Sequence, residues 1–119
     1  MSGAKNTESS RTHMTEMVLP QHTNPFGTAF GGVIMSWMDI CAAIAARRHA
    51  EMPVVTASVD ELHFLKPIRL GDTVMLNAHV TSVGNSSIEV HVHVRVEPLD
   101  PNRAVETTTQ AFFTFVALD

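Results

Sequence analysis

The chain of 119 residues has the length of one ordinary domain, and its 45% hydrophobic and 17% charged residues indicate a packed core rather than disorder. A net charge of −4, with no run of lysines or arginines, argues against a nucleic-acid partner, because phosphate neutralisation needs a basic face. Cys41 is the only cysteine, which excludes an intrachain disulfide and indicates a reducing, cytoplasmic location.

The N-terminal residues 1–12 are polar and lack the apolar stretch of a secretory signal. We therefore expect a flexible N-terminal tail over 1–12 and one domain over 13–119. The longest apolar run, Val33–Ala46, is too short to span a bilayer. Neither export nor a membrane partner is predicted.

The first predicted element is a short strand at Met14–Leu19, which is followed by a loop of turn-forming residues at Gln21–Gly27. Gly31 and Gly32 then open the one long helix, which we expect to end near Ala50.

This helix has an unusual composition, since Ser36 and Asp39 are the only polar residues between Val33 and Ala46. No polar stripe is left to face water, so the helix must be wrapped on most sides.

Four strands are predicted after the helix, at residues 54–65, 72–83, 88–96 and 104–118. The middle two alternate apolar and polar residues and are joined through Gly84, Asn85 and Ser86, which predicts a tight hairpin. The order strand, helix, four strands indicates an α+β architecture with one antiparallel sheet curled around the helix. Because such a sheet has exposed edges, we expect a homodimer formed through edge strands.

Asp39 is the strongest chemical signal, because none of its helical neighbours can neutralise its charge. One interpretation is structural: a neighbouring strand or loop supplies backbone donors to a buried carboxylate. The other is catalytic, since Asp39 is the only carboxylate that the loop and helix can offer as a general base or nucleophile.

Three other features, in the loop and at the start of the helix, each have two interpretations. The N–H groups at Gly31 and Gly32 suit an oxyanion site, although glycines also permit a tight loop. Asn24 begins a sequence typical of a type I turn, and its amide also suits the positioning of a water or carbonyl. His22 is a candidate base or a solvated loop histidine.

Three histidines are expected to gather on the outer face of the sheet, with His79 opposite His91 and His93 two residues along. A polar face or subunit contact is favoured over a metal site, because no cysteine or carboxylate completes a ligand set. Apolar Met75, Phe112 and Val116 on the same face lead us to expect that dimers assemble into a tetramer or hexamer.

The spacing His22-x-Asn24-Pro25-x-Gly27, then Gly31-Gly32-x6-Asp39, resembles the acyl-CoA thioester hydrolase branch of the hotdog superfamily. A second match is Phe64-x-x-Pro67-x-x-x-Gly71-Asp72, and the resemblance extends over nearly the whole chain after residue 16.

This resemblance implies a hotdog fold, in which five antiparallel strands wrap one central helix, and a dimer with its substrate channel at the interface. It places Asp39 in the catalytic acid position and Asn24 beside the water or thioester, with the carbonyl polarised at Gly31 and Gly32. Because the helix separates Gly31 from Asp39, we expect each site to be shared between two subunits.

The resemblance also indicates an acyl-CoA substrate, with no cofactor beyond the coenzyme A that the substrate carries. Candidate contacts to coenzyme A are His22, Lys66, Arg69, Ser86 and Ser87, and Arg47 and Arg48 are further basic residues to examine. Two rival functions stay open at this point: a hotdog hydratase or dehydratase that uses His22 as base, and a non-enzymatic acyl-CoA binding protein.

Overall fold

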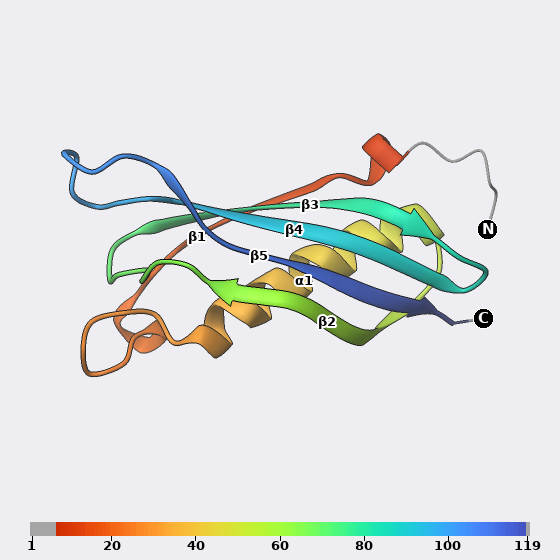
Figure 1. Ribbon diagram of the computed structural model, residues 1–119, viewed down its shortest axis with the longest axis horizontal. Helices are drawn as coiled ribbons and strands as arrows, with labels where there is room; N and C mark the ends of the chain where they lie inside the picture. The colour runs from red at the N-terminus through yellow and green to blue at the C-terminus, as the bar shows by residue number, and fades with distance from the viewer. Residues whose placement is uncertain (1–6, 119) are drawn as a thin grey trace.

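Five strands and one long helix make up the computed structural model, which describes residues 7–118 (Figure 1). The strands are β1 (Thr12–Met17), β2 (Val54–Phe64), β3 (Thr73–Val83), β4 (Ser87–Glu97) and β5 (Glu106–Ala117); the helices are α1 (Gly31–Ala50) and the short 3-10 helices η1 (Thr7–Ser10) and η2 (Pro20–His22). The sheet order is β1-β3-β4-β5-β2 with all neighbours antiparallel, which confirms the predicted hotdog sheet.

The central hairpin follows the predicted alternation of apolar and polar residues. Along β4 the five residues Ile88, Val90, Val92, Val94 and Val96 are buried against α1. The intervening residues lie on the outer face, and His79 pairs with His91 as predicted.

One side of α1 packs onto the concave face of the sheet. Its buried residues recur at helical spacing: Ile34, Trp37, Met38, Cys41, Ala42, Ala45 and Ala46. Burial raises the pKa of the Cys41 thiol to about 11. Within residues 7–118, no helix combines the length and the apolar character that crossing a membrane requires.

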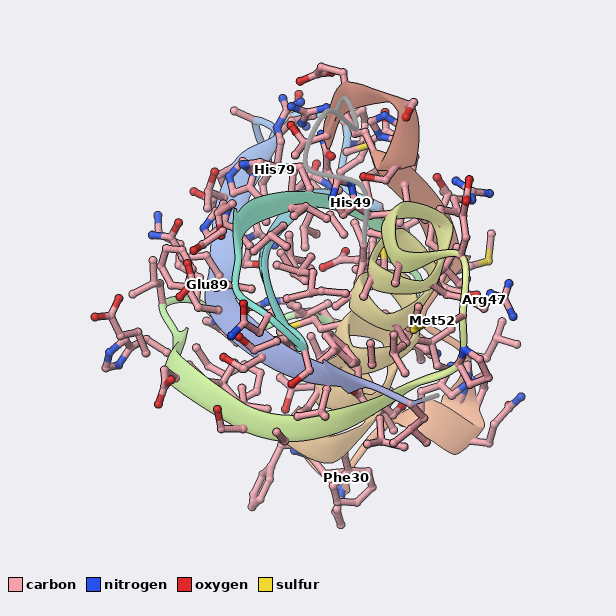
Figure 2. The ribbon with its side chains drawn as sticks, turned by 90° about the vertical axis from the view of Figure 1, so that its right-hand side faces the viewer. Phe30, Arg47, His49, Met52, His79 and Glu89 are labelled. Carbon is pink, nitrogen blue, oxygen red and sulfur yellow. The ribbon has the colours of Figure 1, made fainter. Side chains whose placement is uncertain are left out.

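The opposite side of α1 is left open by the sheet. Met35 is 37% exposed and Ile40 is 50% exposed, and Asp39 lies beside Ile40 only partly buried. Figure 2 shows Arg47 pointing away from the sheet, which curls around the other side of the helix. Within one chain α1 is therefore covered on one side, whereas its composition predicted a helix wrapped on most sides.

Part of the segment predicted as a flexible tail packs on the domain. Thr12 begins β1, Ser10 is buried in η1, and the buried Thr12 Oγ1 contacts Arg48 Nη1 of α1 at 3.2 Å. Residues 7–12, which the sequence predicted to be the end of a flexible tail, thus include η1 and the first residue of β1, and their polar side chains have partners that composition does not show. Residues 1–6 lie outside the described residues.

The turn before β3 contains Gly71 and Asp72, which end the motif Phe64-x-x-Pro67-x-x-x-Gly71-Asp72. Gly71 has a φ of 88°, and a Cβ at this position would lie 2.7 Å from Leu99 Cδ2. Asp72 is 3% exposed, and its carboxylate accepts the N–H groups of Arg69 (2.9 Å) and Leu99 (3.1 Å). These two residues therefore hold the loop after β2 to the loop after β4.

We expect Asp72→Ala to lower the free energy of unfolding by about 2 kcal/mol, because two backbone N–H groups lose a charged acceptor. Urea unfolding followed by the fluorescence of Trp37, at one fixed protein concentration, measures the change. The exposed Asp60 on β2 supplies the control, Asp60→Ala, which should change stability by less than about 0.5 kcal/mol. Equal effects of the two substitutions would contradict this role of Asp72.

Candidate functional site

The loop before α1 is organised around the side chain of Asn24. Its Oδ1 accepts the N–H groups of Phe26 (2.9 Å) and Thr28 (3.2 Å), and its Nδ2 donates to Thr28 Oγ1 (2.8 Å). Gly27, with a φ of 79°, donates its N–H to the Asn24 carbonyl (3.0 Å) and closes the predicted turn. A primary amide has two N–H bonds, and the loop hydrogen bonds use only one of those of Asn24. The other N–H can therefore donate to a ligand.

The N-terminus of α1 begins next to this loop. Phe30 is the N-cap residue, and its carbonyl accepts the first helical bonds, from Val33 (3.1 Å) and Ile34 (3.3 Å). The exposed Gly31 and Gly32 precede these bonds, so their N–H groups have no intrahelical acceptor. The positive end of the helix dipole lies behind them, which suits a developing oxyanion.

Asp39 receives a hydrogen bond from β2, since Thr56 Oγ1 donates to Asp39 Oδ1 at 2.8 Å. The bond uses one of the two carboxylate oxygens. The structural interpretation of Asp39 was thus right in part, although the donor is a hydroxyl and the carboxylate is only partly buried. Sequence reasoning missed Thr56.

A bulge in β2 contributes to this arrangement. The pairing of β2 with β5 shifts register between Thr56 and Ser58, so the strand carries one extra residue directly after Thr56. Bulges re-aim neighbouring side chains, and they occur often beside active sites and on edge strands. Such an irregularity leaves no clear mark in the alternation of a short strand.

His22 links the loop to α1 rather than standing free in solvent. Its Nδ1 accepts the N–H of Leu19 (3.0 Å), and its ring meets the edge of Trp37 with centroids 5.0 Å apart. With Nδ1 occupied, only Nε2 is left for proton transfer or substrate contact. A hydratase that relies on His22 as its base gains no support from this arrangement.

The predicted contacts to coenzyme A lie at two ends of the molecule. Lys66 is ion-paired with Glu106 (2.8 Å) and lines a cavity of about 230 Å³ beside Gly31. The hydrogen bond from Lys66 lowers the pKa of Glu106. Ser86 and Ser87 lie in the β3–β4 hairpin, at the end of the sheet where the C-terminus lies and opposite the start of α1 (Figure 1). One chain therefore does not bring the two sets together.

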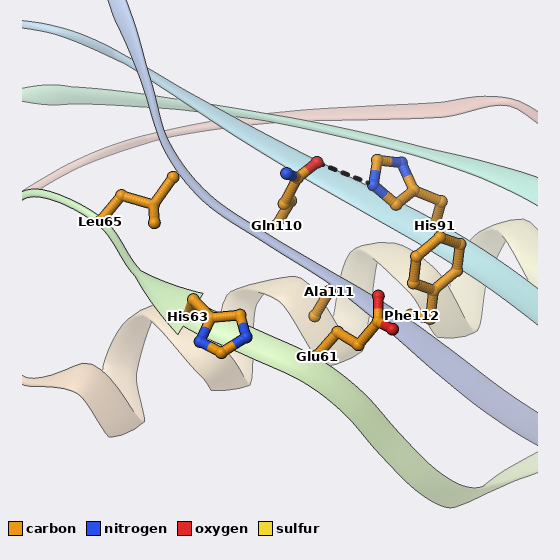
Figure 3. Close-up of a pocket in the computed structure, with 7 residues that line it drawn as sticks. All are labelled: Glu61, His63, Leu65, His91, Gln110, Ala111 and Phe112. Atoms are coloured by element: carbon orange, nitrogen blue, oxygen red, sulfur yellow. Dashed lines mark hydrogen bonds between the residues drawn. The ribbon is translucent and has the colours of Figure 1, made fainter.

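The outer face of the sheet carries a separate cavity of about 330 Å³ (Figure 3). Its lining includes Glu61 and His63 from β2, Leu65 directly after this strand, and His91, Gln110 and Phe112 from β4 and β5. His91 Nε2 lies 3.2 Å from Gln110 Oε1. None of the predicted catalytic or coenzyme A contacts lines this cavity.

The three histidines expected on the outer face do gather there. The ring centroids of His79 and His91 are 5.5 Å apart, and those of His91 and His93 are 6.4 Å apart. Across the part of the chain that the structure describes, no group of three His, Cys, Asp or Glu residues is placed to hold a metal ion.

Comparison with known proteins identifies the family of this chain. The family model described as the thioesterase superfamily matches residues 26–100, which contain the start of α1, Asp39 and Thr56. The chain belongs to this superfamily.

Its relatives include a Bacillus subtilis protein described as an uncharacterized acyl-CoA thioester hydrolase, which is 46% identical over 110 residues. That match covers 92% of this chain, and the chain spans 63% of the relative. A Staphylococcus aureus acyl-CoA hydrolase, solved with butyryl coenzyme A and coenzyme A, is 42% identical with a TM-score of 0.88, over 95% of this chain and 68% of that one. A hexameric acyl-CoA thioesterase is also 42% identical, with a TM-score of 0.89 over 95% of this chain and 72% of that one.

Alanine variants of the Staphylococcus aureus hydrolase replace three residues of the same types as Asn24, Asp39 and Thr56. An asparagine, an aspartate and a threonine were each replaced with alanine there; 15 residues separate the first two, and 17 separate the aspartate from the threonine. Asn24, Asp39 and Thr56 have the same spacing.

The histidines on the outer face predict a pH-dependent stability. Burial, followed by the charges of Arg11 and His91, lowers the pKa of His79, and the nearby Glu8 opposes this only weakly. Burial, His91 and Arg95 lower the pKa of His93. As the pH falls below about 6.5, the unfolded chain takes up these protons first, so stability that is present above this pH is lost toward the folded-state pKa values.

We therefore expect the urea midpoint of the wild type to fall between about pH 7.5 and pH 5 more steeply than that of a His79→Gln, His93→Gln double variant. The exposed His13 on β1 provides the control substitution, His13→Gln. The same pH slope in the wild type and the double variant would contradict the prediction.

Proposed function

We propose that this chain hydrolyses acyl-CoA thioesters to coenzyme A and a carboxylic acid. The observation that carries the proposal is the Asp39–Thr56 hydrogen bond, because its two residues and Asn24 have the spacing of the three residues replaced in the Staphylococcus aureus hydrolase. The relatives named as acyl-CoA hydrolases support the same substrate class.

The reaction adds water across the thioester. An oxygen attacks the carbonyl carbon, the charge that develops on the carbonyl oxygen is stabilised by N–H groups at Gly31 and Gly32, and the carbon–sulfur bond then breaks. The acid keeps the new carbon–oxygen bond, and a proton from water ends on the thiol of coenzyme A. The chemistry needs no cofactor beyond the coenzyme A of the substrate.

Asp39 supplies the reacting carboxylate, and Thr56 is a positioning residue that fixes its rotamer through Oδ1. Asp39 acts either as a nucleophile or as the base that activates water. Single-turnover hydrolysis in heavy-oxygen water tests for the nucleophilic route. Label found in Asp39 identifies attack by the carboxylate through an anhydride that water opens at the aspartyl carbon.

Each active site is built from two chains. Eight residues separate Gly31 from Asp39, which places their backbones about 12 Å apart along α1. An oxyanion donor and an attacking group that each lie about 3 Å from the reacting carbonyl group are themselves roughly 6 Å apart. Two chains that pack antiparallel through the open side of α1 bring Asp39 of one toward Gly31 and Asn24 of the other. The exposed Met35 and Ile40 supply apolar surface for this contact.

The same two-fold arrangement gathers the proposed contacts to coenzyme A. An antiparallel pairing brings the β3–β4 hairpin of one chain, with Ser86 and Ser87, toward the end of the other chain that carries His22, Lys66 and Arg69. We place the dimers in a tetramer or hexamer, with the hexameric relative in support. The free, buried Cys41 fits a reducing cytoplasm.

Replacing Asp39 tests the mechanism. We expect Asp39→Asn to lower turnover, assayed as free thiol, at least about a hundredfold, because the base or nucleophile is lost. Thr56→Val should cost about tenfold, since the carboxylate stays but loses its orienting bond. Asp60→Asn, the same change on the exposed outer edge of β2, should retain full turnover. Near-normal activity of folded Asp39→Asn, or enoyl-CoA hydrated with no thiol released, would refute the proposal.

Mixing inactive subunits tests whether the site is shared. Asn24→Asp is preferable to Asn24→Ala here, because a carboxylate can still accept the N–H groups of Phe26 and Thr28 while the amide donors are lost. A mixed dimer of Asn24→Asp and Asp39→Ala chains then has one doubly damaged site and one intact site, so we expect about half of wild-type activity per mixed dimer.

Verified mixed dimers that stay as inactive as their parents would show that both groups act within one chain. Light scattering of the same samples gives the size of the assembly. A clean dimer mass at micromolar concentration would contradict the tetramer or hexamer.

A further inference from the structure

The cavity beside the N-terminus of α1 is partly open to solvent and is lined mainly by apolar residues, with Thr28 and Lys66 as its polar side chains. It has a volume of about 230 Å³, and its lining includes Gly31, Ile34, Phe64, Lys66, Pro67 and Ile68. Lys66 is the charged member, and its amine is directed to Glu106 Oε2 at 2.8 Å. The space next to the proposed oxyanion donor is therefore mainly apolar.

Phe64 lines this cavity beside the first residue of α1. A Cβ at Gly31 would lie 3.3 Å from both Cε2 and Cζ of the Phe64 ring, so the ring rests against the first residue of α1. Phe64 ends β2 and is 48% exposed, which means that the ring is not part of the core. The size of the side chain at position 64 can therefore change the cavity without changing the fold.

We propose that this cavity takes the acyl chain of the thioester and that Phe64 limits the length of chain that the enzyme accepts. The inference rests on the proposed hydrolase function, which places the thioester carbonyl at Gly31. The thioester carbonyl carries the alkyl chain on one side and the sulfur of the pantetheine arm on the other. The two amides of the pantetheine arm need hydrogen-bond partners. An alkyl chain suits an apolar lining, whereas burying an amide there without partners is unfavourable.

The volume of the cavity indicates the substrate class. Pockets for drug-sized ligands have about 300–1,000 Å³, so the part of the pocket that one chain supplies fits a smaller group, that of a short acyl chain. A longer chain has to displace the Phe64 ring or leave methylene groups in water. Discrimination of about tenfold or more for each misplaced methylene group is typical of apolar pockets.

The test is a chain-length profile of the full-length wild type, Phe64→Ala and Phe64→Trp, measured as kcat/KM for a series of saturated acyl-CoAs from acetyl to dodecanoyl. We expect Phe64→Ala to raise the ratio of dodecanoyl-CoA to butanoyl-CoA hydrolysis by about tenfold or more, and Phe64→Trp to lower it. The neighbouring Leu65 lines the cavity on the outer face instead, so Leu65→Ala is the matched control and should leave the ratio unchanged.

A ratio that stays constant in both folded Phe64 variants would overturn the proposal. So would a uniform change in KM for every chain length together with altered inhibition by coenzyme A, because that pattern places the pantetheine arm in the cavity. If the wild type releases no thiol from any acyl-CoA, the proposed hydrolase function itself fails. That outcome is distinct from a hydrolase whose profile ignores Phe64.

Discussion

The structure depends on how a helix that is apolar nearly all round is kept from water. The sheet covers one side of α1 and leaves a stripe with Met35 and Ile40 exposed. A single chain therefore shields only one side of this helix from water. Asp39 lies on the same open stripe, next to Ile40 and within reach of β2. The surface that favours association and the carboxylate proposed for catalysis are therefore one surface, and a dimer that covers it also encloses the reacting group.

The sequence was informative where a residue type conflicts with its surroundings or repeats with a clear period. Alternation in β3 and β4 predicted the hairpin and the pairing of His79 with His91, and a lone acid in an apolar helix drew attention to Asp39. Thr56 could not be singled out, because a threonine in a strand is ordinary and only the fold brings it to 2.8 Å from Asp39. The packing of residues 7–12 and of Phe64 likewise depends on contacts distant in sequence.

Asn24 shows why a structural and a catalytic interpretation of one residue need not compete. Three hydrogen bonds from its side chain shape the loop, and the amide still retains a donor. The loop that these bonds fix also ties itself to α1 through the His22 carbonyl, which accepts the N–H of Phe30 at 2.9 Å. A donor held in this way needs little reorganisation when a substrate arrives, which favours stabilisation of charge in the transition state.

The burial of Cys41 has a consequence for the fate of the acyl group. A thiolate is the sulfur species that exchanges with a thioester, and with a pKa raised to about 11 and no exposed surface the side chain of Cys41 is neither ionised nor accessible. In the proposed hydrolase, both its burial and its raised pKa disfavour transfer of the acyl group to Cys41. Since Cys41 is the only cysteine in this sequence, no other thiol of this chain is offered to the acyl group in the proposed reaction.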